Sequence, residues 1–403
     1  MTKSSIRDGL ARPESGHRLR AAAGALASLL FVVALVAFPT SAFAGRPPQL
    51  RTPLASAVTT PTGSWAIAAM GRLNDPANTF WELFFRAPGA TRWSLVTPPG
   101  VADNGGLVAG TSSGPLTIGF EPSRLLGYSP LAQTTDGGAH WTPALLPTVL
   151  AAVPDALAYE PAGPGVPGRV LALVRSGRVL ASTASLAIWV PLVSTSVLNA
   201  AGTRSCGVSS IGALALGPGD VPLVGTGCRR ARQVGVFTQT GGLWQSVGPT
   251  LGGSLSGSVT RVLRLDVADS LTAGLVAASS GGGTSLVAVW RPAGESWTVS
   301  APFPVGAHAT LLSTGVGADG ELLVLFGSPG RTPTLAMISP GGSWTRRPPP
   351  PSGAVTLAPM SDGSVDAFGV SGSALRVYTL AQRSNTWVRS QSMAVPIAYG
   401  SSS

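Results

Sequence analysis

The residue types that do chemistry in enzymes and metal sites are scarce in this chain. Its 403 residues include 3 histidines and 2 cysteines, and only 11% of them are charged. His140 and His308, the histidines after the N-terminal region, are too few and too far apart in sequence to suggest a zinc site or a general base. Glutamate is also rare, with five in residues 45–403, although glycoside hydrolysis needs paired carboxylates. The sequence therefore predicts no catalytic residue, no metal and no cofactor.

Arginine is the chemically capable residue that clusters. Arg229, Arg230 and Arg232 form the densest group, and five more lie in comparable predicted loops: Arg72, Arg124, Arg175, Arg178 and Arg331. A guanidinium stays charged and binds carboxylate, sulfate or phosphate groups bidentately, so these loops are candidate anion-binding residues. The alternative is a solvated rim that reflects codon usage. Codon usage would explain why Lys3 is the only lysine, but not why basic and acidic residues are segregated by face in the topology predicted below.

The cysteines favour a disulfide. Cys206 and Cys228 flank two apolar segments, Ala213–Leu216 and Val221–Val224, which are separated by a Gly-Pro-Gly-Asp turn. This pattern predicts a β-hairpin, and the midpoint between the cysteines falls in its turn. The two thiols should therefore lie nearly opposite each other across antiparallel strands. In an oxidising compartment they should pair.

The N-terminus has the features of a targeting segment. Five basic residues precede an apolar run over 21–38, and residues 42–44 read Ala-Phe-Ala, the small-x-small pattern of a signal-peptidase site. We expect cleavage after Ala44, which makes residues 1–44 a signal peptide and residues 45–403 a secreted or cell-surface protein. An uncleaved membrane anchor is the alternative, because the run approaches the roughly 17–25 residues that a span requires.

Tryptophan marks a repeat. Seven tryptophans recur at intervals of 43 to 55 residues: Trp93, Trp141, Trp189, Trp244, Trp297, Trp344 and Trp387. Each follows an apolar segment and a small-residue turn, as Val287–Trp290 does before Trp297 and Leu335–Ile338 does before Trp344. Another short apolar strand lies upstream of each hairpin, as in Leu322–Phe326. A period of this length is typical of a propeller blade, and we expect each repeat tryptophan to be buried between adjacent blades.

Four short strands in each of seven repeats predict an all-β, seven-bladed β-propeller over residues 45–403. The 52 glycines and 35 prolines favour many short strands joined by tight turns over long helices. A six-bladed ring and an eight-stranded sandwich pair are the alternatives.

One repeat carries a recognisable motif. The segment that begins at Thr134 reads Thr-Thr-Asp-Gly-Gly-Ala-His-Trp. It resembles the Asp-box, Ser/Thr-x-Asp-x-Gly-x-Thr-Trp, of the BNR-repeat propellers that include sialidases, and it departs from the motif only at His140. In that family the box is a folding element on the face opposite the active site, so the resemblance implies a fold and not catalysis. Asp136 should accept backbone N–H groups, Gly138 should allow positive φ, and Trp141 should close the hairpin. The other six repeats keep the tryptophan and lose the aspartate.

The predicted topology segregates charge by face. In an up-and-down blade, the loops between the second and third strands emerge on one face of the ring and the turns between the first and second strands on the other. The loops between second and third strands contain the eight arginines and two acidic residues, Asp75 and Glu121. The turns between first and second strands hold acidic residues and no arginine: Glu160, Asp220, Asp266, Asp269, Asp319, Glu321 and Asp362. One face should therefore be positive and the other negative.

This charge pattern favours binding over catalysis. The first hypothesis is a binding module for an anionic glycan, another anionic polymer or an acidic protein, with no nucleic acid expected in an extracellular setting and membrane contact only through an uncleaved signal segment. The second, implied by the resemblance, is a sialidase-like glycoside hydrolase. That enzyme needs three arginines, an aspartate and a Tyr–Glu pair, and no such pair is visible around the tyrosines: Tyr128, Tyr159, Tyr378 and Tyr399.

Overall fold

A computed structural model gives the fold of much of the chain beyond the N-terminal region. It describes residue 50 and residues 57–60, 62–71, 79–97, 106–109, 116–120, 130–145, 154–162, 167–174, 177–183, 188–201, 206–268, 270–281, 283–306, 309–328, 331–351, 353–371 and 374–395. Contacts divide the chain into residues 1–41 and 42–403, and every described residue belongs to the second part. The expected signal peptide, residues 1–44, lies outside the described residues and remains a prediction. Within the described ranges, no helix has the length and apolar character to span a membrane.

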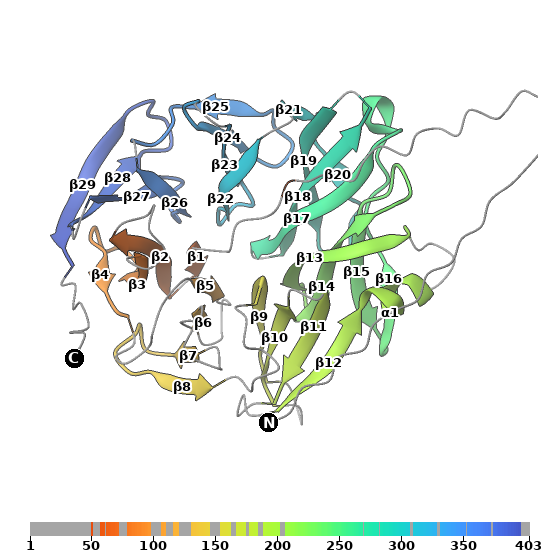
Figure 1. The fold of residues 1–403 in the computed structure, drawn as a ribbon, viewed down its shortest axis with the longest axis horizontal. Helices are drawn as coiled ribbons and strands as arrows, with labels where there is room; N and C mark the ends of the chain where they lie inside the picture. The colour runs from red at the N-terminus through yellow and green to blue at the C-terminus, as the bar shows by residue number, and fades with distance from the viewer. Residues whose placement is uncertain are drawn as a thin grey trace, which may run out of the picture. The chain divides into compact units, whose positions relative to one another are not determined.

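The first three sheets are antiparallel sets of four consecutive strands (Figure 1). The first contains β1 (Ala57–Thr60), β2 (Gly63–Gly71), β3 (Thr79–Arg86) and β4 (Ser94–Leu95). The second contains β5 (Gly106–Ala109), β6 (Leu116–Phe120), β7 (Pro130–Thr134) and β8 (Thr142–Leu145). The third contains β9 (Ala156–Glu160), β10 (Arg169–Val174), β11 (Arg178–Ser182) and β12 (Trp189–Ser194).

A larger sheet combines two sets of the same kind. One set contains β13 (Val208–Gly217), β14 (Val221–Cys228), β15 (Gly235–Thr240) and β16 (Leu243–Ser246). The other contains β17 (Val259–Ala268), β18 (Leu271–Ser280), β19 (Gly283–Pro292) and β20 (Thr298–Val299), with β21 (Phe303–Val305) also paired to β19. Strand pairing joins the two sets at one residue pair, Gly227 of β14 with Arg261 of β17.

Two further four-stranded sheets complete the described part of the chain. One contains β22 (Thr310–Val316), β23 (Leu322–Gly327), β24 (Thr334–Ile338) and β25 (Thr345–Arg347), and the other β26 (Ala354–Pro359), β27 (Val365–Ser371), β28 (Ala374–Leu380) and β29 (Trp387–Ala394). Helix is limited to short elements such as α1 (Thr195–Ala200), which Ser194 caps, and the 3₁₀-helix η3 (Gly253–Leu255). The prediction of a nearly all-β chain is confirmed.

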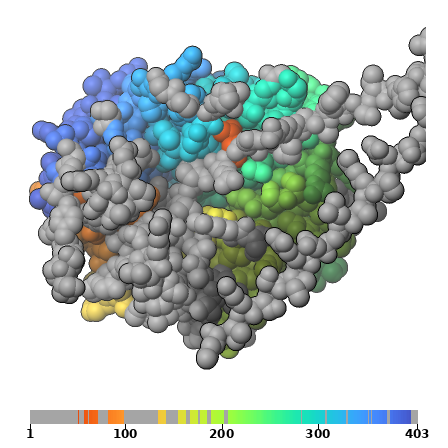
Figure 2. Space-filling view, in the orientation of Figure 1, coloured from red at the N-terminus to blue at the C-terminus, as the bar shows by residue number. Residues whose placement is uncertain are grey.

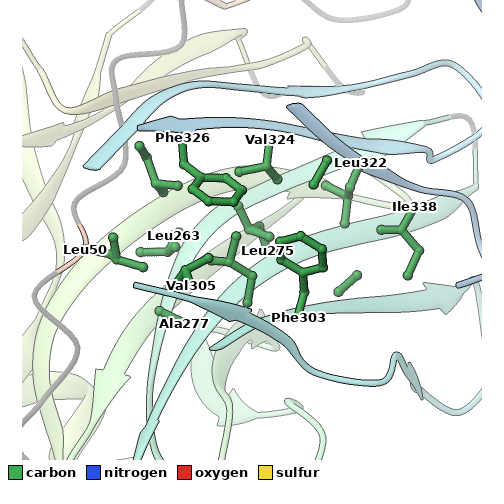
Figure 3. Packing of buried hydrophobic residues seen from close by; sticks show 14 of the residues in the cluster. Leu50, Leu263, Leu275, Ala277, Phe303, Val305, Leu322, Val324, Phe326 and Ile338 are labelled. Carbon is green, nitrogen blue, oxygen red and sulfur yellow. The ribbon is translucent and has the colours of Figure 1, made fainter. Parts of the chain in front are cut away.

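Burial explains why the middle strands have nearly continuous apolar sequences. In β18 every residue from Thr272 to Ser279 is buried, whereas β29 is mostly exposed. Strands covered on both faces need apolar side chains on both, while a strand at a sheet's edge does not. Figure 3 shows one such core, in which Leu275 of β18 packs with Phe303 and Phe326 from neighbouring strands. The two phenylalanine rings lie edge to face with their centroids 5.9 Å apart.

Contacts connect the first strand of each set to the first strand of the next. They link β1 to β5, β5 to β9, β9 to β13, β13 to β17, β17 to β22, β22 to β26, and β26 back to β1. The first and last sheets also share a core in which Phe84 packs on Phe368, and Figures 1 and 2 show their orange and blue segments next to each other. The two ends of the described chain therefore pack against each other.

Repeat tryptophans such as Trp244 and Trp387 lie at contacts between successive sheets, but the expectation that all seven are buried is wrong. Only Trp93 and Trp244 are buried, at 2% and 7% exposure, and the other five repeat tryptophans are half-buried. Three indole N–H groups donate to the preceding repeat: Trp297 to Val247, Trp344 to Ala301 and Trp387 to Pro348. The three acceptors come shortly after the fourth strands of the preceding sets, β16, β20 and β25.

Candidate functional site

A short loop between β14 and β15 carries three of the arginines that the sequence singles out. Arg229, Arg230 and Arg232 follow Cys228, the last residue of β14, and all three are exposed. Residues 229–234 are called the Arg loop below. The position of this loop between the second and third strands of its set agrees with the sequence-based assignment.

The disulfide anchors the start of the Arg loop. Cys206 and Cys228 are bonded, with their Cα atoms 5.2 Å apart, which confirms the predicted pair. The N–H of Arg229 donates to the Gly207 carbonyl at 2.9 Å, and the N–H of Arg230 donates to the Cys206 carbonyl at 3.0 Å. The backbone of the first two arginines is therefore held to the segment that carries the other cysteine.

The second half of the Arg loop is fixed by two other segments. The N–H of Arg232 donates to the Ser258 carbonyl at 2.9 Å, and its carbonyl accepts the N–H of Leu251 at 2.6 Å. The N–H of Val234 donates to the Pro249 carbonyl at 3.0 Å. Arg232 has a φ of 72°, in the left-handed region that residues other than glycine rarely adopt. Such a conformation persists where its surroundings enforce it, as these hydrogen bonds do.

The guanidinium groups of the Arg loop are available to a ligand. Across the described part of the chain, no hydrogen bond or ion pair engages the side chains of Arg229 and Arg230. Arg232 uses only Nε, which donates to the Leu251 carbonyl at a long 3.4 Å. Three cationic side chains are thus presented on a fixed backbone, an arrangement suited to carboxylate, sulfate or phosphate groups.

The remaining predicted arginines are only partly placed. Arg331 is exposed in the equivalent loop before β24, where its N–H donates to the Ser328 carbonyl. Arg178 is exposed too, but it is the first residue of β11 and not a loop residue as predicted, because its hairpin turn is shorter than the sequence suggested. Arg72, Arg124 and Arg175 lie outside the described residues.

The predicted acidic face needs correction. Glu160 and Asp266 are strand residues in β9 and β17, and each pairs with an arginine: Glu160 with Arg169 and Asp266 with Arg264, both at 2.9 Å. The sequence reading counted turn residues only, whereas Arg169 lies directly across from Glu160 in the sheet. Asp269 lies outside the described residues. Three turns between first and second strands keep an exposed acidic residue: Asp220, Asp319 and Asp362.

The segment that begins at Thr134 forms a turn held by its own side chains. Thr134 Oγ1 donates to Asp136 Oδ1 at 2.8 Å and accepts the N–H of Gly138 at 3.0 Å. As expected, Asp136 accepts a backbone N–H, that of His140, at 2.9 Å on Oδ1, and Gly138 has a positive φ of 86°. The ring of Trp141 lies edge to face with a tryptophan of the first sheet, at 6.4 Å between centroids.

The hydrogen bonds of this turn favour the ionised form of the Asp136 carboxylate. The backbone N–H and then the ring of His140, followed by the hydroxyl of Thr134, lower the pKa of Asp136 from 3.8 to about 2. The Nδ1 atom of His140 lies 2.6 Å from Asp136 Oδ2, and both side chains are exposed. His140, the one departure from the motif, thus supplies a partner for Asp136.

Sequence reasoning missed a buried ionic cluster between the first and last sheets. Asp366 in β27 is 1% exposed, and its Oδ2 atom accepts from Arg86 Nη1 and from Trp93 Nε1, both at 2.8 Å. Its Oδ1 atom accepts from Thr379 Oγ1, and Gln391 bonds to both the N–H and the carbonyl of Trp93. A lone aspartate inside an apolar strand was a signal that could have been noticed. Two of its partners, Arg86 and Trp93, are 280 and 273 residues away and leave no local pattern.

The described residues contain no arrangement that favours hydrolysis. Burial raises the pKa of both Glu82 and Glu321, but these carboxyls belong to different sheets. Glu82 accepts a hydrogen bond from the hydroxyl of Thr97, and Glu321 accepts one from the hydroxyl of Ser339. No group of three metal-binding side chains occurs in the ranges that the structure covers. Tyr128 and Tyr399 lie outside those ranges, and the two described tyrosines form no hydrogen bond to a glutamate. The sialidase-like alternative gains no support.

Comparison with known proteins gives structural similarity only. No family model and no curated protein matches the chain. The BP39L lectin from Burkholderia pseudomallei is 15% identical with a TM-score of 0.48, over 85% of this chain and 100% of the lectin. YCF48 from Cyanidioschyzon merolae is 16% identical with a TM-score of 0.42, over 83% and 94%. The six-bladed β-propeller lectin of Aleuria aurantia is 11% identical with a TM-score of 0.38, over 86% and 99%. At these values the similarities assign no ligand or activity.

Proposed function

We propose that the protein is a secreted or cell-surface β-propeller of the Asp-box group that acts as a binding module, and that the Arg loop holds an anionic polymer. An acidic protein segment is the other occupant with matching chemistry. The observation that carries the proposal is the Arg loop itself, in which three exposed guanidinium groups project from a backbone fixed by a disulfide and by hydrogen bonds at both ends.

A fixed loop favours binding for a thermodynamic reason. Ordering a mobile loop around a ligand would offset part of the interaction energy, and a loop that is already ordered avoids that cost. Arginine adds strength because each guanidinium can donate two parallel hydrogen bonds to one anionic group. Adjacent arginines on such a loop should therefore hold neighbouring charges of a polymer together.

We also propose that the sheets form a closed ring of seven blades. Seven sets of four consecutive strands and the chain of contacts between first strands, from β26 back to β1, support this count. The tryptophan bonds support closure. Trp344 and Trp387 each contact the residue four positions after the preceding repeat tryptophan, Ala301 and Pro348. Trp93 in turn is held by Gln391, four positions after Trp387.

The proposal is tested by removing the loop charges. We expect the triple variant Arg229→Ser, Arg230→Ser, Arg232→Ser to bind a polyanion such as dextran sulfate at least about tenfold more weakly, since charge-assisted hydrogen bonds are lost. Its melting temperature should barely change, because exposed loop side chains contribute little to the core. Affinity is measured by titration calorimetry and folding by circular dichroism.

The matched control removes positive charge elsewhere. Arg92 and Arg383 are exposed in turns between the third and fourth strands of the first and last sheets, whereas the Arg loop belongs to the set β13–β16. The variant Arg92→Ser, Arg383→Ser should keep nearly full affinity. Equal losses in the two variants would mean that net charge alone attracts the polymer and that the Arg loop is not the site.

A further inference from the structure

A shallow groove of about 420 Å³ lies between two successive blades, beside the Arg loop. One wall is the segment after β16 and the other is the turn between β19 and β20; the side chains that matter below are Pro249, Thr250, Arg291, Glu295 and Trp297. Trp297 Nε1 donates to the Val247 carbonyl at 2.5 Å, which holds the aromatic ring against the opposite wall. The volume of the groove is within the range of small-molecule sites.

The groove combines an aromatic face with groups that bind hydroxyls. The guanidinium carbon of Arg291 lies 6.0 Å from the centre of the Trp297 ring, and Arg291 Nε donates to the Glu295 carbonyl at 2.9 Å. Within the described ranges, the terminal nitrogens of Arg291 and the carboxylate of Glu295 have no other partner. The groove is thus lined by the Trp297 ring with the Arg291 donor fork above it, by an acceptor carboxylate at Glu295 and by a hydroxyl at Thr250.

The charges of the groove identify what it can hold. The positive charge of Arg291 and the negative charge of Glu295 cancel, so the groove does not select for a charged group as the Arg loop does. A sugar ring presents an apolar C–H face and a rim of hydroxyls that both donate and accept. The C–H face suits the Trp297 ring, and the hydroxyls suit the fork and the carboxylate. A polyphosphate chain lacks this combination.

The groove is continuous with the Arg loop. Thr250 forms a bridge with Gln233, and the N–H of Leu251 donates to the Arg232 carbonyl at 2.6 Å. The N–H of Val234 donates to the Pro249 carbonyl at 3.0 Å. One wall of the groove is therefore paired with the Arg loop as neighbouring strands are, about 5 Å apart. A chain of linked sugars could occupy both at once.

We infer that the polymer held by the Arg loop is an acidic polysaccharide, with one sugar ring stacked on Trp297 in the groove and the acidic groups of neighbouring units on the Arg loop. This inference rests on the proposed anion binding and names its ligand class. An acidic protein or another non-saccharide polyanion would use the Arg loop alone.

The test compares two polyanions with and without sugar rings. Hyaluronate oligosaccharides and polyaspartate of matched charge are titrated against the full protein and the variant Glu295→Gln. Removing this carboxylate should weaken hyaluronate binding about threefold to tenfold, through the lost hydrogen bonds to hydroxyls. The same change should leave polyaspartate binding unchanged or slightly stronger, because a nearby negative charge is gone. Opposite effects on the two polymers support the inference.

A second variant tests the stacking contact. Trp297→Ala should weaken hyaluronate binding by about fivefold or more and spare polyaspartate. Trp344→Ala is the matched control, since Trp344 is also half-buried and donates its indole N–H to the preceding repeat, at Ala301. If Trp297→Ala does not fold, Arg291→Gln replaces it, because within the described ranges the Arg291 side chain makes one hydrogen bond, to the Glu295 carbonyl, besides its contact with the Trp297 ring.

The failures of the two proposals are distinguishable. If Glu295→Gln and Arg291→Gln change binding of both polymers equally, the groove does not recognise sugar and the inference is wrong, while the Arg loop can still be the anion site. If neither polymer binds with an affinity that depends on Arg229, Arg230 and Arg232, the proposed function itself fails.

Discussion

Asp136 accepts hydrogen bonds within the turn that follows β7. Its pKa is lowered from 3.8 to about 2 by the backbone and ring of His140 and by Thr134. A folded-state pKa below the unfolded one means that the stabilisation is complete above about pH 4 and is lost as the pH falls through about 2. We expect the His140 amide resonance to titrate in this acid range, followed by NMR. In Asp136→Asn that titration should be absent, and its persistence would assign the transition to another group.

The buried carboxylate of Asp366 links the last sheet to the first through hydrogen bonds. It accepts hydrogen bonds from Arg86, Trp93 and Thr379, and Asp366→Ala would leave the Arg86 charge without its partner. Breaking a buried pair on one side costs about 3–5 kcal/mol, so we expect a loss of that size in the free energy of unfolding in urea. The double variant Arg86→Met, Asp366→Leu should lose less, because no charge is left buried. A loss below about 1 kcal/mol for Asp366→Ala would show that the cluster does not stabilise the packing of the first sheet on the last.

At the scale of elements, the disulfide is the clearest stabilising device. Cys206 and Cys228 are 22 positions apart, and closing a loop of this length in the unfolded chain is worth about 3 kcal/mol in the chain-entropy account. Reduction should lower the unfolding free energy by that amount and should also loosen the Arg loop, whose first residues bond to the segment around Cys206. Hydrogen exchange at the Arg229 and Arg230 amides measures the second effect. Unchanged exchange after reduction would mean that the hydrogen bonds alone fix the loop.

Trp244 is the repeat tryptophan that tests the packing of one blade on the next. It is 7% exposed and packs in a cluster with Phe237 and with residues of the preceding sheet, Leu173 and Val179. We expect Trp244→Ala to cost about 3–5 kcal/mol of unfolding free energy, as large truncations in cores do. Arg383→Ser, an exposed turn residue, should cost less than about 0.5 kcal/mol. Similar stabilities for the two variants would show that the tryptophan repeat is not a packing repeat.

Local patterns were sufficient to predict many strands and one covalent link. The expected strands Leu322–Phe326 and Leu335–Ile338 lie within β23 and β24, and the hairpin between the cysteines is β13 and β14. These features depend on apolar runs and turn residues that are close in sequence. Helix α1 was not predicted, because six residues leave too short a pattern for a helical period to be recognised.

For the whole molecule, sequence patterns fail where partners are far apart along the chain. The contact of Asp366 with Arg86 joins the first and last sheets, and the backbone bonds that fix the Arg loop come from residues near 206, 250 and 258. The arginine cluster could be predicted from sequence positions, but the hydrogen bonds that fix its backbone could not. It also missed the pairing of Glu160 with Arg169, because charges in turns were counted without the strand register that sets their neighbours.

The most direct measurement of the central claim is the salt dependence of polyanion binding in three proteins: the unaltered chain, the Arg229/Arg230/Arg232→Ser variant and the Arg92/Arg383→Ser variant. Raising the salt from 0.1 M to 1 M shortens the Debye length from about 10 Å to about 3 Å, so ionic contacts weaken. We expect affinity to fall steeply with salt in the unaltered chain and in the Arg92/Arg383 variant, and only weakly in the Arg loop variant. Equally steep curves in all three proteins would contradict the account, because the binding charges would then lie outside the Arg loop.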